Sequence, residues 1–195
     1  MAQSSNRSLA ALLLIVCIDI VHTELPLAAT TLARLNLNQL ARAADAVARV
    51  RCTGSAGHLE NGTVWTDTQF AVIEPLKGST PSQITVRLPG GHAGHIFVSI
   101  EAVPRFRPGE EGVLFLEKLP AGEYSVTAWA LGTFRIRRND RSAEETVTQD
   151  SSATTVFDPA SRQFITEGIR DLPLGEFRRR LAAAFRAPAA ERNKP

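Results

Sequence analysis

Cysteine is scarce in this sequence, because 195 residues include only Cys17 and Cys52. Two thiols cannot build a four-cysteine zinc site, and small secreted scaffolds held by disulfides use more of them. Cys17 lies in an apolar segment that we expect to be removed, which leaves Cys52 without a disulfide partner. Stability must therefore come from a hydrophobic core, and we interpret Cys52 as a small buried side chain within a strand.

Recognisable catalytic motifs are absent as well. The sequence has no G-x-S-x-G, H-E-x-x-H or Walker-type motif and no Rossmann glycine pattern. Acid–base chemistry needs two titratable groups held in one pocket, whereas Glu110 and Glu111 are adjacent in a predicted turn and point apart. We therefore predict that the protein is not an enzyme, that it needs no cofactor, and that no residue is catalytic, cofactor-binding or metal-binding.

An excess of one charge is also missing. The net charge is +2, charged residues make up 22% of the chain, and hydrophobic residues make up 44%. This composition is typical of a folded globular protein, and the small net charge gives no electrostatic reason to expect nucleic acid as a partner. The length suits one domain with a core of its own.

The only long apolar run is "LAALLLIVCI" at residues 9–18. The run is too short to cross a bilayer, but with Arg7 before it the segment has the layout of a secretory signal peptide. We predict a signal peptide at residues 1–29, cleaved near Ala29, and an exported protein that is periplasmic or secreted. The alternative is a retained segment that tethers an envelope structural protein, and membrane contact would then run through this segment only.

Hydrophobic periodicity predicts helices at both ends of a set of short strands. Asn36 and Gln39 have the spacing of a capping box, which indicates a helix at residues 36–45. The pattern then alternates with period two, and Asn61-Gly62 indicates a tight hairpin turn. We expect strands at residues 46–53, 64–78, 83–89, 95–101, 112–119 and 123–138, with pairing that ends at Pro75, a bend at Gly132 and an edge hairpin within 145–158.

A C-terminal helix is expected at residues 173–187, where Leu174, Phe177 and Leu181 fall on one apolar stripe. The stripe suits docking onto the strands, which we favour, although the basic face would also suit an anionic membrane surface. The chain then divides into a signal peptide at 1–29, an N-terminal helix at 30–45, a β-barrel domain at 46–158, a C-terminal segment and helix at 159–187, and a disordered tail at 188–195.

Short antiparallel strands between helices are typical of a small β-barrel or a β-sandwich. Long, bent strands early and late in the chain favour the barrel, because such strands must turn a corner. We therefore predict a mainly β fold, a small antiparallel OB-like β-barrel with flanking N- and C-terminal helices, and keep the β-sandwich as the alternative.

Several turn and strand motifs, taken together, resemble a known family. The motifs are "ARAADAVARVRC", "TDTQFAVIEPLKG", "ITVRLPGG", "VPRFRPGEEGVLFL" and "YSVTAWALGTFRI". They resemble a family of uncharacterised bacterial exported domains, and also the OB-like barrel of netrin-type, tissue-metalloprotease-inhibitor-like modules. The resemblance covers residues 38–137 and implies the fold more than the function. Inhibitors of that kind chelate the protease zinc with an N-terminal cysteine, and a chain that begins at Thr30 has none, so that mechanism is not implied.

The stretch "PGGHAGHIF" carries an H-x-x-H pair, His92 and His95, whose spacing suggests a metal site. Three glycines make a helix unfavourable there, and on a strand an offset of three places the two side chains on opposite faces. A metal site would also need a third ligand, such as His58. We interpret the stretch as a glycine-rich connection with exposed histidines. The alternative is a metal-binding protein or metal-dependent hydrolase that uses His92 and His95.

These observations favour an exported, non-enzymatic binding module for a protein or a cell-envelope component. OB-like barrels bind through one strand face and its loops, so we expect the surface to include an exposed strand face and the loops 88–95 and 104–112. We interpret Trp65 and Trp129 as aromatics of the core or its rim. The sequence indicates neither the identity of the partner nor the oligomeric state.

The signal-peptide interpretation predicts that the exported protein begins at Thr30. Mass spectrometry of the intact protein, recovered from the periplasm or medium of an expressing bacterium, should give the mass of residues 30–195. A mass that includes Met1 would instead support the retained anchor, because the segment would then have escaped cleavage.

Overall fold

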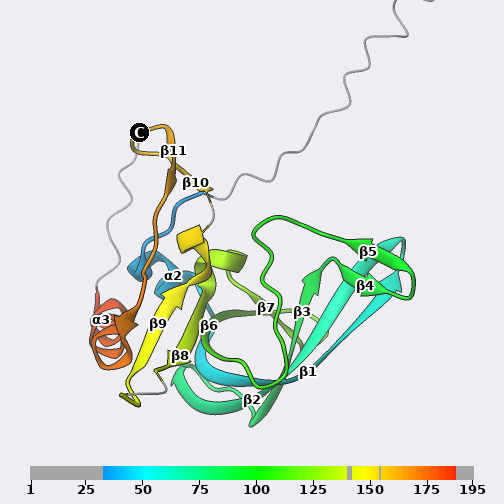
Figure 1. Ribbon diagram of the computed structural model, residues 1–195, viewed down its shortest axis with the longest axis horizontal. Coiled ribbons are helices and arrows are strands. Elements are labelled where there is room, and N and C mark those ends of the chain that lie inside the picture. Colours follow the sequence, from blue (N-terminus) through cyan, green and yellow to red (C-terminus); the bar gives the residue numbers. More distant parts are fainter. Residues whose placement is uncertain (1–32, 140–141, 154, 188–195) are drawn as a thin grey trace, which may run out of the picture. The chain divides into compact units, whose positions relative to one another are not determined.

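A computed structural model describes residues 33–139, 142–153 and 155–187 (Figure 1). The predicted signal peptide at 1–29 and the predicted tail at 188–195 lie outside the described residues. The described part is mainly β, with one large sheet and two α-helices, which confirms the predicted class. Within that part, no helix is both long enough and apolar enough to span a membrane.

The elements follow the predicted order with several changes of length. The helices are α2 (Leu37–Ala43) and α3 (Leu174–Arg186), with short 3₁₀ helices η2 (Trp129–Gly132) and η3 (Asp150–Ala153). The strands are β1 (Ala46–Glu60), β2 (Thr63–Lys77), β3 (Gln83–Pro89), β4 (Gly91–Ala93), β5 (Ile96–Val98), β6 (Glu111–Lys118), β7 (Tyr124–Val126), β8 (Thr133–Arg138), β9 (Glu145–Gln149), β10 (Thr155–Asp158), β11 (Gln163–Thr166) and β12 (Leu172–Pro173).

A long hairpin of β1 and β2 begins the sheet. Its turn has φ of 49° at Asn61 and 78° at Gly62, the left-handed pair that a tight two-residue turn requires, so this prediction is confirmed. The predicted end of pairing at Pro75 is wrong, because pairing with β1 continues to Lys77. The register of β1 and β2 shifts beside Pro75, as at a β-bulge. Proline has no backbone N–H to donate, and a bulge lets the strands continue to pair beyond it.

The large sheet has the strand order β1-β2-β3-β7-β6-β8-β9-β12, and β1 also pairs with β6. The pairings among β1, β2, β3, β7 and β6 therefore form a closed circuit, in which β3 meets β7 in parallel at Val86 and Tyr124. The remaining strands β8, β9 and β12 continue from β6. Every strand of the circuit is thus hydrogen-bonded on two sides.

Strand β1 separates two hydrophobic clusters. Ala48, Val50 and Cys52 point into the circuit and pack with β2, β3, β6 and β7. Val47 points the other way, into a cluster that includes α2, α3, β6, β8 and β9. Strand β1 therefore contributes apolar side chains to both hydrophobic clusters, while Arg49 and Arg51 follow Val47 on its outer face.

Both helices cover the second cluster (Figure 1). The Asn36 side chain accepts a hydrogen bond from the Gln39 backbone N–H, and Gln39 accepts one from the Asn36 N–H, so the predicted capping box is confirmed. Helix α3 buries Leu174, Phe177 and Leu181 together with Ala184. Its apolar stripe therefore docks onto the fold, as we favoured over a membrane surface.

Two other predicted elements are wrong. The segment 123–138 is two strands with η2 between them, because at Gly132 a Cβ would lie 2.1 Å from the Thr127 carbonyl oxygen and only glycine fits this tight turn. The segment 145–158 is not one hairpin. Strand β9 pairs with β8 and β12, and β10 pairs with β11, since both find partners more distant in the sequence.

The β4–β5 hairpin lies against the outer half of β1 and β2 (Figure 1). The Gly90 N–H donates to the Val64 carbonyl oxygen at 2.6 Å, and the Thr66 hydroxyl donates to the Gly90 carbonyl oxygen at 2.6 Å. On β1, a Cβ at Gly57 would lie 1.9 Å from the His92 carbonyl oxygen. The close approach of β4 to β1 therefore depends on the missing side chain at Gly57.

This contact predicts that Gly57→Ala displaces the β4–β5 hairpin. We expect the free energy of unfolding, measured by chemical denaturation, to fall by about 1–3 kcal/mol, because backbone must move to admit the methyl group. Gly54→Ala is the matched control on the same strand, since a Cβ at Gly54 meets nothing within 4 Å. Equal effects of the two substitutions would contradict the contact.

Candidate functional site

A groove of about 630 Å³ lies where the β1–β2 turn, the end of β3, the β6–β7 connection and η2 meet. Its volume is within the range of small-ligand pockets. We call it the tryptophan groove and define it by its lining residues. They are Glu60, Asn61, Thr63, Trp65, Arg87, Pro89, Leu119, Pro120, Ala121, Glu123, Ser125 and Trp129.

Two tryptophans from distant parts of the chain line this groove. Trp65 stands on β2 between His58 of β1 and Pro89 of β3 in the pairing register. Trp129 begins η2 and also packs partly against the cluster inside the strand circuit. Both side chains are partly exposed, so our interpretation as rim aromatics describes their burial but missed their shared groove.

The backbone that carries Trp129 is strained. Ala128 and Trp129 have φ of 51° and 50°, a left-handed conformation that costs a residue with a Cβ about 1–2 kcal/mol. The surroundings hold it in place. The Thr133 hydroxyl donates to the Trp129 carbonyl oxygen at 3.0 Å, and the Ala130 N–H donates to the Ala102 carbonyl oxygen at 3.0 Å. Strain that is retained in this way is typical of functional sites.

The rim of the tryptophan groove is charged and internally paired. Arg87 contacts Asp67 at 2.9 Å, Glu60 at 3.3 Å and Glu123 at 3.4 Å. The hydrogen bond to Asp67 raises the pKa of Arg87 against the opposing effect of burial. His58 lies 3.5 Å from Asp67 and 3.6 Å from Glu60. Because three carboxylates share one guanidinium, the rim is acidic and disfavours polyanions.

The predicted H-x-x-H pair takes a different place in the fold. His92 is on β4, where its ring stacks on Phe97 with centroids 4.4 Å apart, and His95 is in the turn before β5. The stretch is therefore a small hairpin and not the plain connection that we expected, and both histidines are exposed. His58 lies on β1 beside the rim carboxylates. Among residues 33–139, 142–153 and 155–187, no group of three metal-ligating side chains is found.

The two loops that we expected to form the binding surface are joined by one arginine. Arg105 donates to the Pro89 carbonyl oxygen at 3.0 Å and to the Gly90 carbonyl oxygen at 3.2 Å. This fixes the segment after β3 against the segment before β6. Of these two loops, only Pro89 lines the tryptophan groove.

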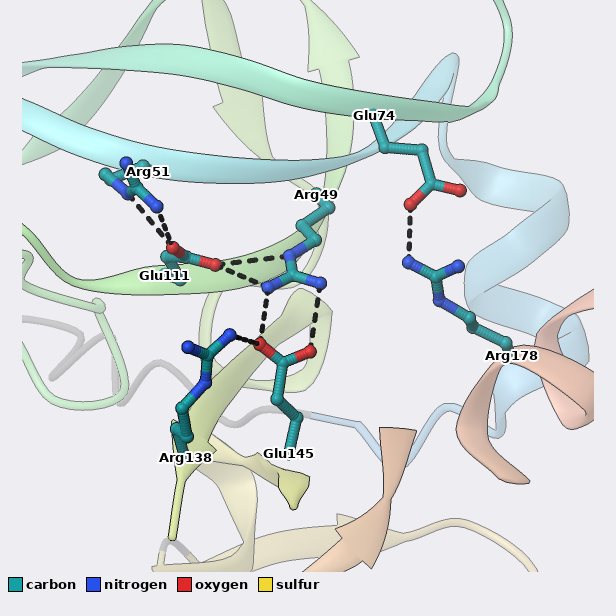
Figure 2. Close-up of polar contacts among 7 residues, drawn as sticks. All are labelled: Arg49, Arg51, Glu74, Glu111, Arg138, Glu145 and Arg178. Atoms are coloured by element: carbon teal, nitrogen blue, oxygen red, sulfur yellow. Dashed lines mark hydrogen bonds and ion pairs between the residues drawn. The ribbon is translucent and has the colours of Figure 1, made fainter. Parts of the chain in front are cut away.

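A second polar cluster lies on the outer face of β1 and joins four strands (Figure 2). Arg49 lies between Glu111 of β6, at 2.7 Å, and Glu145 of β9, at 2.9 Å. Arg51 also binds Glu111, and Arg138 of β8 binds Glu145 at 3.0 Å. Each charge of this arginine–glutamate cluster has a partner of opposite charge, so the cluster ties the four strands together.

The pairing shifts the acidities of the cluster. Burial alone would raise the pKa of Glu111, but hydrogen bonds from Arg49 and Arg51 outweigh it and hold the pKa below its ordinary value. Hydrogen bonds from Arg49 and Arg138 lower the pKa of Glu145. Sequence reasoning missed this cluster because its members are brought together only by the pairing of β1 with β6 and β8 with β9.

Cys52 is 1% exposed and lies inside the strand circuit. Burial raises the pKa of its thiol, which keeps the thiolate rare at neutral pH. The interpretation of Cys52 as a small buried side chain within a strand is confirmed.

The arginine–glutamate cluster predicts how stability depends on pH. Because the pKa of Glu111 and Glu145 is lowered by folding, their contribution is fully present above the unfolded value near 4.5 and is lost as pH falls through the lower folded value. Glu111→Gln and Glu145→Gln should each lower the melting temperature at pH 7 and flatten its fall below about pH 4.5. Glu117→Gln, an exposed position on the same strand as Glu111, should change neither. If the melting temperature of every variant instead falls between pH 7 and pH 3 in parallel with that of the original chain, the stabilising role of these two glutamates is contradicted.

A scan against protein-family models and a search of curated proteins give no match to this chain. The resemblance of its motifs to a family therefore stays a prediction.

Proposed function

We propose that this chain is an exported, non-enzymatic binding module whose ligand, a protein or a cell-envelope component, occupies the tryptophan groove. The observation that carries the proposal is the placement of Trp65 and Trp129 in one groove, the latter on strained backbone. Large, partly exposed aromatic side chains are the usual anchors of binding sites. Export is supported by the predicted signal peptide.

We also propose that the circuit of strands is an OB-like barrel, as the resemblance of the sequence motifs suggests. It is supported over a β-sandwich by the closed circuit of pairings, by the parallel contact of β3 with β7, and by the sharing of β1 between β2 and β6. Barrels of this type bind ligands on the face of their second and third strands, between two loops. Here β2, β3, the β1–β2 turn and the β6–β7 connection all line the groove.

Binding is favoured over catalysis by the way the polar groups of the groove are engaged. Arg87 pairs with Glu60, Asp67 and Glu123, so these carboxylates are held in fixed positions by one cation. Fixed acceptors and donors suit recognition, because little side-chain freedom is lost when a ligand binds.

The proposal predicts that Trp65→Ala weakens ligand retention without unfolding the protein. Immobilised protein should retain one or more components of a bacterial envelope extract, and the substitution should reduce that retention by about tenfold, because a stacking platform is lost. Phe164→Ala is the matched control, since Phe164 is an aromatic side chain that is 66% exposed on β11 and does not line the groove.

The experiment compares the retention of envelope components by the original chain, Trp65→Ala and Phe164→Ala. The expected pattern is similar retention by the original chain and by Phe164→Ala, and about tenfold weaker retention by Trp65→Ala. Equal retention by all three, with the circular dichroism of each unchanged, would show that the groove is not the binding site.

A further inference from the structure

The walls of the tryptophan groove offer flat apolar surfaces. Within the described part of the chain, neither Trp65 nor Trp129 is stacked against another aromatic ring. Pro89, Leu119 and Pro120 extend the apolar lining between them. The face of an indole carries negative potential and attracts the polarised C–H groups of a ring laid on it. Such walls suit a ligand with flat C–H faces.

The rim adds hydrogen-bonding groups of both kinds at fixed positions. Arg87 has only donors, while Glu60 and Glu123 have only acceptors, and Asn61 has both. A hydroxyl group donates and accepts, so a polyhydroxylated ligand can use all of these groups at once. The ion pairs of Arg87 with both glutamates hold the rim in place before a ligand arrives.

The charges of the rim favour a ligand without net charge. A polyanion would meet the carboxylates of Glu60 and Glu123, with Asp67 beside them and one guanidinium to offset the three. A basic side chain would be attracted by the excess of carboxylate charge, but Arg87 already pairs with each of these carboxylates, so the newcomer would have to displace one of those ion pairs. A neutral ligand meets no such repulsion and leaves the ion pairs in place.

We infer that the ligand of the tryptophan groove is a neutral oligosaccharide. Sugar rings lie on Trp65 and Trp129, and their hydroxyl groups bind Arg87, Glu60 and Glu123. The groove volume of about 630 Å³ suits a short run of sugar rings and exceeds the need of a single one. This inference rests on the proposed function, because it names the chemistry of the ligand in the same groove.

Isothermal titration calorimetry of the full chain tests the inference with four probes. They are chitotetraose and cellotetraose, which are neutral, a sulfated heparin tetrasaccharide, and a proline-rich decapeptide, since peptides of that kind also dock in aromatic grooves. We expect at least one neutral tetrasaccharide to bind, and to bind more tightly than the sulfated one.

Three variants locate the binding. Trp65→Ala should weaken the neutral tetrasaccharide by about tenfold through the loss of stacking. Glu123→Gln should weaken it several-fold, because one acceptor of the rim becomes a mixed donor and acceptor and its ion pair with Arg87 is lost. Phe164→Ala should leave the affinity unchanged. Circular dichroism confirms that each variant is folded.

The outcomes separate this inference from the proposed function. Binding of the decapeptide alone, weakened by Trp65→Ala, would overturn the oligosaccharide and leave the binding module intact. Tighter binding of the sulfated probe, or sugar binding that Trp65→Ala does not change, would overturn the inference as well. Failure of all four probes, together with envelope retention that Trp65→Ala does not affect, would overturn both.

Discussion

Strand β1 is hydrogen-bonded to β2 along one edge and to β6 along the other, and this double pairing organises the rest of the molecule. It closes the circuit of strands, and it leaves β1 with no free edge over residues 47–51. Each face of β1 must then be covered. Val50 and Cys52 fill the circuit, Val47 meets the cluster beneath the helices, and Arg49 reaches the glutamates that join β6 to β9. One strand thus links both hydrophobic clusters and the arginine–glutamate cluster.

The tryptophan groove follows from the same arrangement. Beyond the part of β1 that pairs with β6, the β1–β2 hairpin continues as a pair, and its turn stands beside the β6–β7 connection. Trp65 and Arg87 come from the outer faces of β2 and β3, while Trp129 is brought in by the turn that ends β7. The left-handed backbone at Ala128 and Trp129 is the local consequence, and its strain is offset by the contacts around η2.

Local features of the fold were predictable from the sequence, and distant pairings were not. The capping box of Asn36 and Gln39 and the turn at Asn61-Gly62 depend only on neighbouring residues, so spacing and residue type were sufficient. Gly132 misled the interpretation, because its requirement for no side chain comes from Thr127 and produces a turn between two strands instead of a bend in one. Strand β9 likewise pairs with β8 and β12, and no local sequence pattern predicts these partners.

The candidate site was harder to predict for the same reason. Trp65 and Trp129 are far apart in the sequence, and nothing in the residues around either one indicates that they line a common groove. The H-x-x-H pair attracted attention because its spacing is local, yet it lies on an exposed hairpin, and the described residues bring no third metal-ligating side chain to it. The chain contains only two tryptophans, which makes the central claim directly measurable. In a ¹H–¹⁵N spectrum the two indole N–H signals, assigned with Trp65→Phe, should both shift and saturate as chitotetraose or cellotetraose is added. Indole signals that stay unmoved while either sugar binds would contradict the assignment of the groove as the binding site.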